Sequence, residues 1–596
     1  MESYWSTVLD RRVSRRRAMV ATGAFAAGAA FVAACGGGGE DSGSKDKSSL
    51  LAPREDTTAK ARPGGIWTNT GNPLPANLDA NANSSVAGFA YITAAYSTLT
   101  KYGRAIGALP GPDAITGDAA ESWELSPDGT QITLKLRQNH KFDPRPPTNG
   151  RAMTSADVKF SWDRTIGISP LIGDVYRPKN PAGQIESLTA PDERTVVIKL
   201  AVPYGAITEL LSYYFFHVMP READGGFNPK TEARGSGPFT IQKYDPTGTG
   251  VIQLRRNPDW YVKDRPFLDG MDKFEISEYA QSLAQFESKA VMTFGVKQQD
   301  ILRVKKDHPE MVLRLNSTPA AASPAQNSDF IFSQREDSMF KDIRLRRAAS
   351  MLYDRDLYIE TFFSTKEFTD AGIAVDTMWT SHLPVQCLNW NDPRNKDFGE
   401  AAKWFKYDPA EAKKLLAASG FSGKFPFAWR GLVGNANFND TGLVVSNMLE
   451  QGGMPLERNP LNENDWRAWK TRGDENYSGM FQSTSHGFND DSLLVSKYTP
   501  QGTDRVSNRP IPGVTDAVLK IQSELDLKKR NEMIKQMQRQ LADLMLDMPQ
   551  ETQQRQFTVH WPWLKNWGVF FSNGFSNDSS SGRPYTEYWY DASLKT

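Results

Sequence analysis

Apolar and polar residues alternate in several short segments of the chain, which predicts strands that bury one face. The clearest case is 123–137, where the alternation is interrupted at Pro127-Asp128-Gly129. That tripeptide is a turn signal, so the segment predicts a β-hairpin. Shorter alternations predict further strands at 195–200 and 250–254.

Other segments repeat their apolar residues every three to four positions, which predicts helices with one buried stripe. Three of these helices begin after a side chain that can cap the first turn, namely Thr154, Asp342 and Asp408. A fourth, longer helix is predicted from about 528 to 545. Because strands and helices are mixed without strict alternation, the chain predicts an α/β fold in several lobes.

The N-terminal segment has the pattern of an export signal. Arg15 and Arg16 precede an uncharged run of small and apolar residues, 18–34, which ends at Cys35. The paired arginines resemble a twin-arginine signal, although ordinary secretion stays open. Val-Ala-Ala-Cys resembles the site at which a lipoprotein is cleaved and acylated on cysteine. The alternative is an uncleaved anchor, but 17 such residues are short for about 30 Å of hydrocarbon.

Residues 35–62 are rich in Gly, Ser and charged side chains. Such a composition buries too little apolar surface to fold, so we expect a flexible tether behind the lipidated cysteine. A tether of this kind places the rest of the chain in water beside the membrane. The remaining length exceeds one hydrophobic core and therefore predicts at least two lobes.

Charge and cysteine content exclude several classes of function. The chain has 70 basic and 70 acidic residues, which argues against a nucleic-acid partner. Cys387 is the only cysteine after Cys35, so internal disulfides and paired-cysteine metal sites are excluded. The six histidines lack metal-site spacing, and Gly235-Ser-Gly is followed by Pro238, so no hydrolase elbow is present. An enzyme that uses one pair of carboxylates stays open.

Six segments spread over the chain carry a resemblance to one protein family. They are Ser126-Pro-Asp-Gly-Thr130, Met153-Thr-Ser-Ala-Asp-Val-Lys-Phe-Ser161, Gly235-Ser-Gly-Pro-Phe239, Arg256-Asn-Pro-Asp-Trp-Tyr261, Phe340-Lys-Asp-Ile-Arg-Leu-Arg-Arg-Ala348 and Tyr407-Asp-Pro-Ala-Glu-Ala-Lys-Lys-Leu-Leu416. Together these segments resemble the family 5 extracellular solute-binding proteins, which serve ABC importers of oligopeptides, dipeptides and nickel. The resemblance covers about 500 residues, and the segments follow one another in the order of the family.

The resemblance implies a periplasmic-binding-protein-like clamshell of the large peptide-binding subclass, with mixed sheets in each lobe. In the family the chain crosses twice between the lobes. We place the crossings at 328–332 and at 548–558. The expected organisation is therefore a signal peptide, 1–34; a lipidated cysteine and tether, 35–62; lobe I, 63–330; lobe II, 331–550; and a C-terminal return to lobe I, 551–596.

The resemblance also indicates where a ligand would bind. Peptide-binding members carry a Trp-x-x-Asp segment whose carboxylate pairs with the peptide amino group. Aligned through Asp491, this chain has Ser483 at the tryptophan and His486 at the aspartate. A neutral imidazole lacks the fixed negative charge that a buried ammonium needs, so we expect poor binding of ordinary peptides. A neighbouring aspartate stays open as a substitute.

The expected ligand contacts are mostly aromatic, because rings cover the apolar faces of sugars and flat organic solutes. They are Tyr96, Trp379, Phe481, Ser483, His486 and Phe488. The alternative for each ring is a place in the core, and for His486 a loop histidine that is already hydrogen-bonded. The run 489–491 is expected to cap a helix or form a turn rather than bind a metal.

We therefore expect an extracytoplasmic, lipid-anchored receptor that captures a small organic solute, such as a peptide or glycoside, and passes it to ABC permease subunits. It should act as a monomer, without cofactor, metal or catalysis. Two alternatives stay open: a cell-surface hydrolase with paired carboxylates about 10 Å apart or less, and a chaperone-like or structural lipoprotein without an interlobe cavity.

Overall fold

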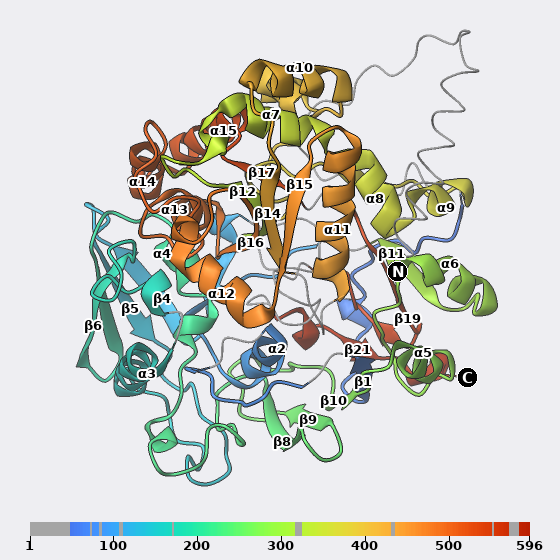
Figure 1. Cartoon of the computed structure of the whole chain (residues 1–596). Helices are drawn as coiled ribbons and strands as arrows, with labels where there is room; N and C mark the ends of the chain where they lie inside the picture. Colours follow the sequence, from blue (N-terminus) through green and yellow to red (C-terminus); the bar gives the residue numbers. More distant parts are fainter. Residues whose placement is uncertain are drawn as a thin grey trace.

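The computed structural model describes residues 48–71, 74–82, 86–106, 111–169, 172–315, 325–430, 436–550, 553–570 and 583–595. Three sheets, each with its own helices, account for most of this part of the chain (Figure 1). The predicted export and lipidation residues Arg15, Arg16 and Cys35 lie outside the described residues.

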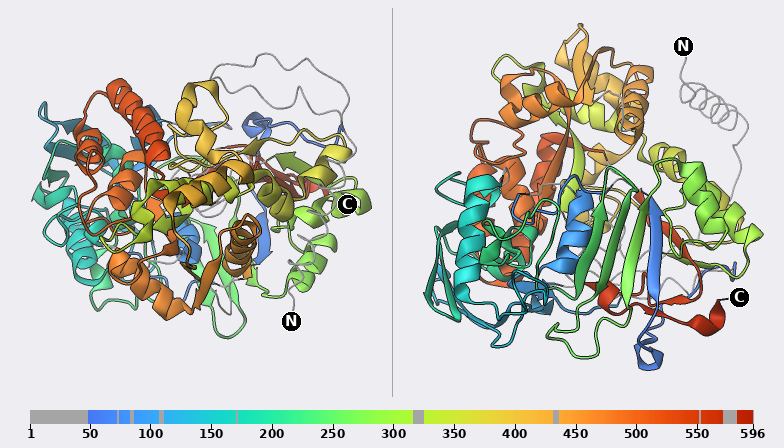
Figure 2. Two further views of the ribbon diagram at one scale, coloured as in Figure 1. Left: turned by 45° about the horizontal axis from the view of Figure 1, so that its top comes forward. Right: turned by 90° about the horizontal axis from the view of Figure 1, so that it is seen from below.

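The first sheet has four strands in the order β1-β10-β9-β8. β1 runs parallel to β10, and the other neighbours are antiparallel. The sheet and the helices around it share one hydrophobic cluster, and Figure 2 shows α2 beside its strands. The elements are β1 (Ile66–Gly71), α2 (Val86–Ala95), β8 (Phe239–Asp245), β9 (Val251–Arg256), β10 (Gly270–Glu275), α5 (Tyr279–Glu287) and α6 (Gln298–Asp307).

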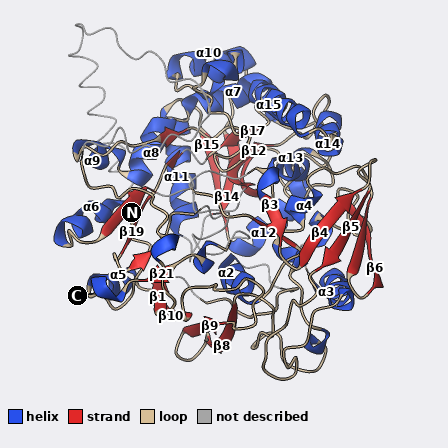
Figure 3. Ribbon diagram, turned by 180° about the vertical axis from the view of Figure 1, so that it is seen from behind, coloured by secondary structure: helices blue, strands red, loops and turns tan. Residues whose placement is uncertain are grey.

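The second sheet is antiparallel, in the order β4-β5-β7-β6, and has its own cluster with α3 (Figure 3). The predicted hairpin is confirmed by the pairing of β4 with β5, in which Leu125 faces Ile132. The helix predicted after Thr154 is also confirmed, with Thr154 and Asp157 in a reciprocal capping box. The elements are β4 (Ala120–Leu125), β5 (Gln131–Leu136), α3 (Ser155–Ile168), β6 (Ile185–Asp192), β7 (Thr195–Leu200) and α4 (Ile207–Leu210).

The third sheet has five strands in the order β15-β14-β16-β12-β17. Alternate residues of β12 enter two different clusters: Phe330 and Phe332 one, Ile331 the other. Successive side chains of a strand point to opposite faces of the sheet, and here they are apolar on both. Both faces of this sheet are therefore buried. The strands are β12 (Ala325–Phe332), β14 (Phe425–Arg430), β15 (Leu456–Leu461), β16 (Met480–Gly487) and β17 (Asp547–Pro549).

Helices cover both faces of this third sheet. One face packs on α7 (Ile343–Leu352), α8 (Arg355–Phe363), α10 (Pro409–Ser419) and α11 (Ala436–Gln451), the other on α12 (Glu463–Arg472), α13 (Asp490–Tyr498), α14 (Thr515–Ser523) and α15 (Leu527–Leu544). The predicted caps are confirmed, because Asp342 accepts from the Arg344 backbone and Asp408 from the Glu411 backbone. We refer to the first two sheets as the first lobe and to the third as the second lobe.

The chain passes between the lobes at two neighbouring places. After β11 (Val312–Leu315) it enters the second lobe as β12, and it leaves through β17, which pairs with β12. Beyond β17, β18 (Gln553–Gln554) pairs with β13 (Thr377–Met378), and β19 (Phe557–His560) pairs with β11. The first lobe also holds the short pairs β2 (Thr100–Tyr102) with β3 (Ile115–Gly117) and β20 (Leu564–Lys565) with β21 (Trp589–Tyr590).

Two segments differ from the predicted organisation. The last residues of the expected tether, from about Leu50, lie along the first lobe: the Ala52 backbone donates to Leu313, and the Thr57 backbone to Asn566. The polar composition of 35–62 predicted a flexible tether, but Leu50 and Leu51 make apolar contacts with the first lobe. Conversely, α9 (Thr365–Asp370), assigned to the second lobe, places Phe368 on Phe557 with ring centroids 4.3 Å apart.

Among the described residues, no helix combines the length and the hydropathy that a bilayer crossing demands.

Candidate functional site

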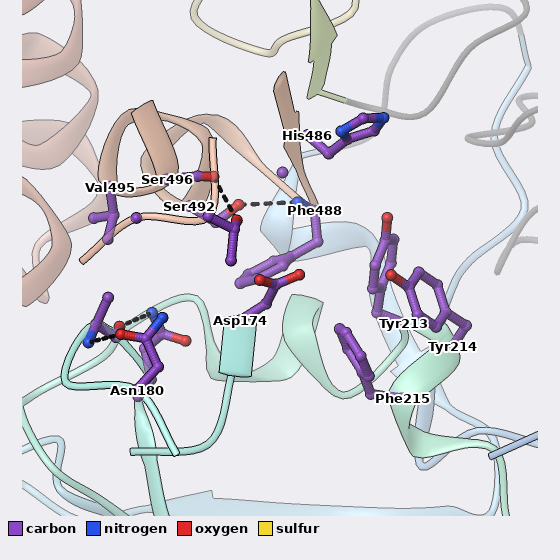
Figure 4. Close-up of a pocket in the computed structure, with 15 residues that line it drawn as sticks. Asp174, Asn180, Tyr213, Tyr214, Phe215, His486, Phe488, Ser492, Val495 and Ser496 are labelled. Carbon is purple, nitrogen blue, oxygen red and sulfur yellow. Dashed lines mark hydrogen bonds between the residues drawn. The ribbon is translucent and has the colours of Figure 1, made fainter. Parts of the chain in front are cut away.

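A cavity lies where the second sheet's loops meet the end of β16 and the start of α13. It holds about 500 Å³ of space, part of which is open to solvent. The first lobe contributes Asp174, Gln184 and the aromatic run 213–215, and the second lobe contributes 486–488 together with residues of α13 and the loop that follows it (Figure 4). Both lobes therefore line the same cavity.

The sequence after β16 fixes the second lobe's side of the cavity. At Gly487 a Cβ atom would come within 2.6 Å of the Leu493 nitrogen, so the tight approach requires glycine. Asn489 then caps α13, and Ser492 bonds back to it in a capping box. This confirms the prediction that the run 489–491 caps a helix. Ser492 Oγ also accepts from the Phe488 backbone nitrogen at 2.9 Å, which fixes the backbone of Phe488.

The Phe488 side chain extends from the second lobe into the first. Although it belongs to the second lobe, it is 7% exposed and packs into the cluster of the second sheet, with its ring 5.8 Å from that of Tyr213. Next to it, Asn489 Nδ2 donates to Glu209 Oε2 at 3.1 Å. These contacts hold the lobes together on one side of the cavity.

Three consecutive rings form the first lobe's wall. The Tyr213 and Tyr214 centroids are 4.3 Å apart, and those of Tyr214 and Phe215 are 4.4 Å apart. Their 3-10 turn, Tyr214–Phe216, follows α4 and brings successive side chains round to one place. Such a wall offers both ring faces and hydroxyl groups to a ligand.

Asp174 is the acidic group of this cavity, and its carboxylate points towards the cavity's centre beside the Phe488 ring (Figure 4). Its Oδ1 atom is inaccessible to solvent and has no hydrogen-bond partner among the residues that the structure describes. Burial, together with the negative charge of Asp504, raises the pKa of Asp174 to about 7, against a weaker opposing effect of the Thr503 hydroxyl. The group therefore titrates near neutrality.

Asp504 lies near Asp174, but its pKa is shifted in the opposite direction. It accepts from the His486 backbone at 2.7 Å and pairs with Lys470 Nζ at 2.8 Å. Burial opposes its ionisation, but Lys470 and His486 together hold the pKa of Asp504 well below its usual range. The His486 ring lies 3.6 Å from the same carboxylate, with 41% of the side chain exposed. Asp504 is thus a stable anion that its neighbours neutralise.

A second cavity of about 430 Å³ shares Phe488 with the first and is lined also by Glu209, Asn389, Asp490 and Arg530 among others. Asp490 accepts from the backbones of Leu388 and Asn389 at 3.1 and 2.8 Å, so its charge is used in holding this loop. In the part of the chain that the structure describes, no group of His, Cys, Asp and Glu could hold a metal ion.

Of the six predicted contact residues, the structure brings only His486 and Phe488 to the cavity. Phe481 is 1% exposed and stacks on Tyr477, and Ser483 is 2% exposed opposite Asp329 in the sheet. The alternation along β16 explains both positions, because its two faces are buried beneath helices.

The other two predicted rings lie in cores. Tyr96 is fully buried, and its hydroxyl accepts from the Arg234 backbone at 3.2 Å. Trp379 is 9% exposed and donates from its indole nitrogen to Asp356 at 3.0 Å. Both rings therefore occupy the alternative position, a place in the core, where their polar atoms are hydrogen-bonded and which lies away from the described cavity.

Sequence reasoning missed Asp174 and the aromatic run 213–215. The run Tyr213-Tyr-Phe-Phe216 is unusual for a loop and was a usable signal. Asp174 had none, since a single acid between Gly173 and Val175 matches no motif.

The chain matches a known protein family. Residues 114–504 match the sequence profile of the bacterial extracellular solute-binding proteins, family 5 Middle. The chain belongs to this family. It is 26% identical over 368 residues to a Brucella ovis protein provisionally named an ABC transporter peptide-binding protein, covering 60% of this chain and 59% of that one. It is 20% identical over 455 residues to the periplasmic oligopeptide-binding protein OppA of Salmonella typhimurium, covering 71% and 76%.

Solved structures share the fold. The chain superimposes with a TM-score of 0.67 on DppA from Helicobacter pylori in complex with the peptide STSA, at 17% identity, covering 89% of this chain and 99% of that one. AgaA from A. tumefaciens in complex with agropinic acid gives 0.66 at 20% identity, covering 88% and 99%. The predicted α/β clamshell of the large peptide-binding subclass is therefore confirmed.

Proposed function

We propose that this protein is an extracytoplasmic receptor that captures a small organic solute between its two lobes and delivers it to the permease of an ABC importer. The single observation that carries this proposal is the cavity lined from both lobes, in a chain of the solute-binding family. Relatives named for peptides and for an opine acid indicate the range of solutes to test.

The two crossing strands support closure about a hinge. β12 and β17 are neighbours in one sheet, so the two crossings lie side by side. Rotation about them would separate Phe488 from Tyr213 and open the cavity, whereas a ligand that touches both walls would favour the closed state. The lobes are proposed as 63–330 with 551–596, and 331–550.

The test of this function begins with the solute. Native mass spectrometry of the purified chain should detect an organic molecule carried through purification. Adding that molecule back to stripped protein should raise the melting temperature, by linkage, and should reduce the radius of gyration in X-ray scattering. Stabilisation without compaction would contradict the hinge, and a stripped protein that binds no solute would contradict the function.

We further propose that Cys35 anchors the receptor to the membrane after removal of 1–34, and that Arg15 and Arg16 belong to the export signal. Cys35→Ala should then move the protein from the membrane into the soluble exported fraction with its solute binding unchanged. A variant that stays in carbonate-washed membranes would contradict the lipid anchor.

The absence of catalysis is also a proposal. Asp174 and Asp504 lie near one another, as a carboxylate pair would, but Asp504 is held as an anion by Lys470 and by the His486 backbone. An acid already committed to these partners is a poor nucleophile or base. Unchanged solute recovered after long incubation would support the receptor.

A further inference from the structure

We propose that the cavity takes the ammonium group of an organic amine, held by Asp174 of the first lobe. This inference rests on the proposed function, and it places the negative charge in the first lobe rather than at His486 in the second. It is carried by two hydrogen-bond acceptors that the folded chain leaves unused and by the rings beside them.

The two acceptors belong to Asp174 and Gln184, which both line the cavity. Within the described part of the chain, Asp174 Oδ1 and Gln184 Oε1 are each buried without a hydrogen-bond partner. The Gln184 amide is already oriented, because its Nε2 donates to the Ala182 carbonyl at 3.0 Å. Two acceptors without a donor require hydrogen-bond donors, which an ammonium ion supplies and an ether or a quaternary amine does not, and the negative charge of the carboxylate favours the ammonium over a neutral hydroxyl.

The aromatic side chains complete the site. Tyr213, Tyr214, Phe215 and Phe488 all line the same cavity as Asp174. Ring faces attract a cation and also cover the apolar body that carries it. The site therefore favours an amine attached to an apolar or aromatic group over a free inorganic ion.

The other charges around Asp174 do not cancel its preference for a cation. Asp504 faces it from the loop after α13 and adds negative potential, while Lys470 of α12 is committed to Asp504 at 2.8 Å. His486 at the end of β16 lies against Asp504 as well. Tyr214, from the turn on the other side, is a neutral hydroxyl because burial raises its pKa well above the usual value.

Proton competition follows from this arrangement. The pKa of Asp174 is about 7 without ligand, so a proton occupies the carboxylate below neutrality and must leave when the ammonium binds. The affinity for an amine should be highest near pH 8 and should weaken by about tenfold for each pH unit well below 7.

The experiment uses the mature chain and two probes of nearly equal shape, 2-phenylethylamine and 2-phenylethanol, titrated by calorimetry at pH 8 and pH 6. We expect the amine to bind at least tenfold tighter than the alcohol at pH 8 and to lose at least fivefold at pH 6. Asp174→Asn should remove the preference for the amine and the pH dependence, and Gln184→Leu should weaken the amine by a smaller factor.

The matched control is Asp224→Asn, which removes an exposed carboxylate of the same lobe and should change neither affinity. A melting temperature of Asp174→Asn at or above that of the control would show that the site variant folds. Equal binding of the two probes, no binding of either, or an Asp174→Asn variant that keeps the amine preference would each overturn the inference. A copurified neutral solute that still compacts Asp174→Asn would leave the proposed function standing while the inference fails.

Discussion

Two clusters of buried carboxylates in this protein differ in one respect, the presence of a cation. In the second lobe, Lys497 Nζ lies 2.9 Å from both Asp329 and Asp547, and the Tyr498 hydroxyl donates to Asp547 at 2.7 Å. In the cavity, Asp174 has the Thr503 hydroxyl, and among the described residues it has no paired cation and one of its oxygens has no hydrogen-bond partner. In the first cluster each carboxylate has a paired cation, whereas in the second Lys470 pairs with Asp504 and Asp174 has no ion pair among the described residues.

The difference separates a structural role from a binding role. Asp329 lies on β12 and Asp547 on β17, so Lys497 ties together the two strands by which the chain crosses between the lobes. Burial opposes the charge of Lys497, but the two carboxylates raise its pKa above the usual value. A buried charge with its partners present stabilises one arrangement, and a buried charge without a partner leaves that place to a ligand.

The largest effect is expected from removing the cation of the first cluster. Lys497→Met leaves two buried carboxylates without a positive partner and should lower the free energy of unfolding by about 3–5 kcal/mol. Urea denaturation followed by circular dichroism measures the change. The exposed Lys520→Met on α14 is the matched control and should stay within about 0.5 kcal/mol of the wild type.

A second substitution tests the reason for that loss. Adding Asp329→Asn to Lys497→Met removes one of the uncompensated charges, so the double variant should be more stable than Lys497→Met alone. If Lys497→Met is as stable as its control, the cluster is not a structural clamp and the comparison fails.

Most of the fold was predictable because its elements carry local signals. The caps at Thr154, Asp342 and Asp408 depend on side chains within three residues of the helix start, and each is where the sequence put it. The packing of the expected tether was not predictable in this way. Leu50 and Leu51 contact residues that are distant in the sequence, and no local pattern indicates such contacts.

The site was predictable only in part for the same reason. His486 and Phe488 were found through a family motif, but their partners come from a distant stretch of the first lobe. Whether a ring such as Tyr96 lies in a cavity or in a core depends on its tertiary neighbours, and periodicity cannot distinguish the two. The unpaired state of Asp174 is likewise a property of the folded chain.

The next effect concerns the ring that joins the two regions. Phe488→Ala removes a side chain of the second lobe that is buried against the second sheet, which should weaken the closed state by about 2–3 kcal/mol. The affinity for the copurified solute should fall roughly 30- to 150-fold. Calorimetry gives the affinity, and X-ray scattering should show a larger radius of gyration for the variant at equal solute concentration. A variant that binds and compacts as the wild type does would exclude Phe488 from closure.

Substitution of Asp174 should raise the stability of the protein, whereas substitution of Lys497 should lower it. The pKa of Asp174 is about 7 in the folded chain, above the ordinary value of 3.8, so wild-type stability falls as pH rises between these values. Asp174→Asn should therefore stabilise the ligand-free protein at pH 8 by about 1–2 kcal/mol and change little near pH 4.5. Urea denaturation at both pH values measures this, with Asp224→Asn as control. A loss of stability at pH 8 would make Asp174 a structural residue.

The smallest effect is expected at His486, the residue that the family motif singled out. Its backbone nitrogen, not its ring, makes the 2.7 Å bond to Asp504, and its side chain is 41% exposed. An exposed contact of this kind contributes about 0.5 kcal/mol or less, so His486→Ala should change the affinity for the solute less than threefold. Asp174→Asn, measured beside it with an amine, should lose at least tenfold. A large loss at His486 with none at Asp174 would return ligand recognition to the second lobe, because the decisive charge would then act from the end of β16.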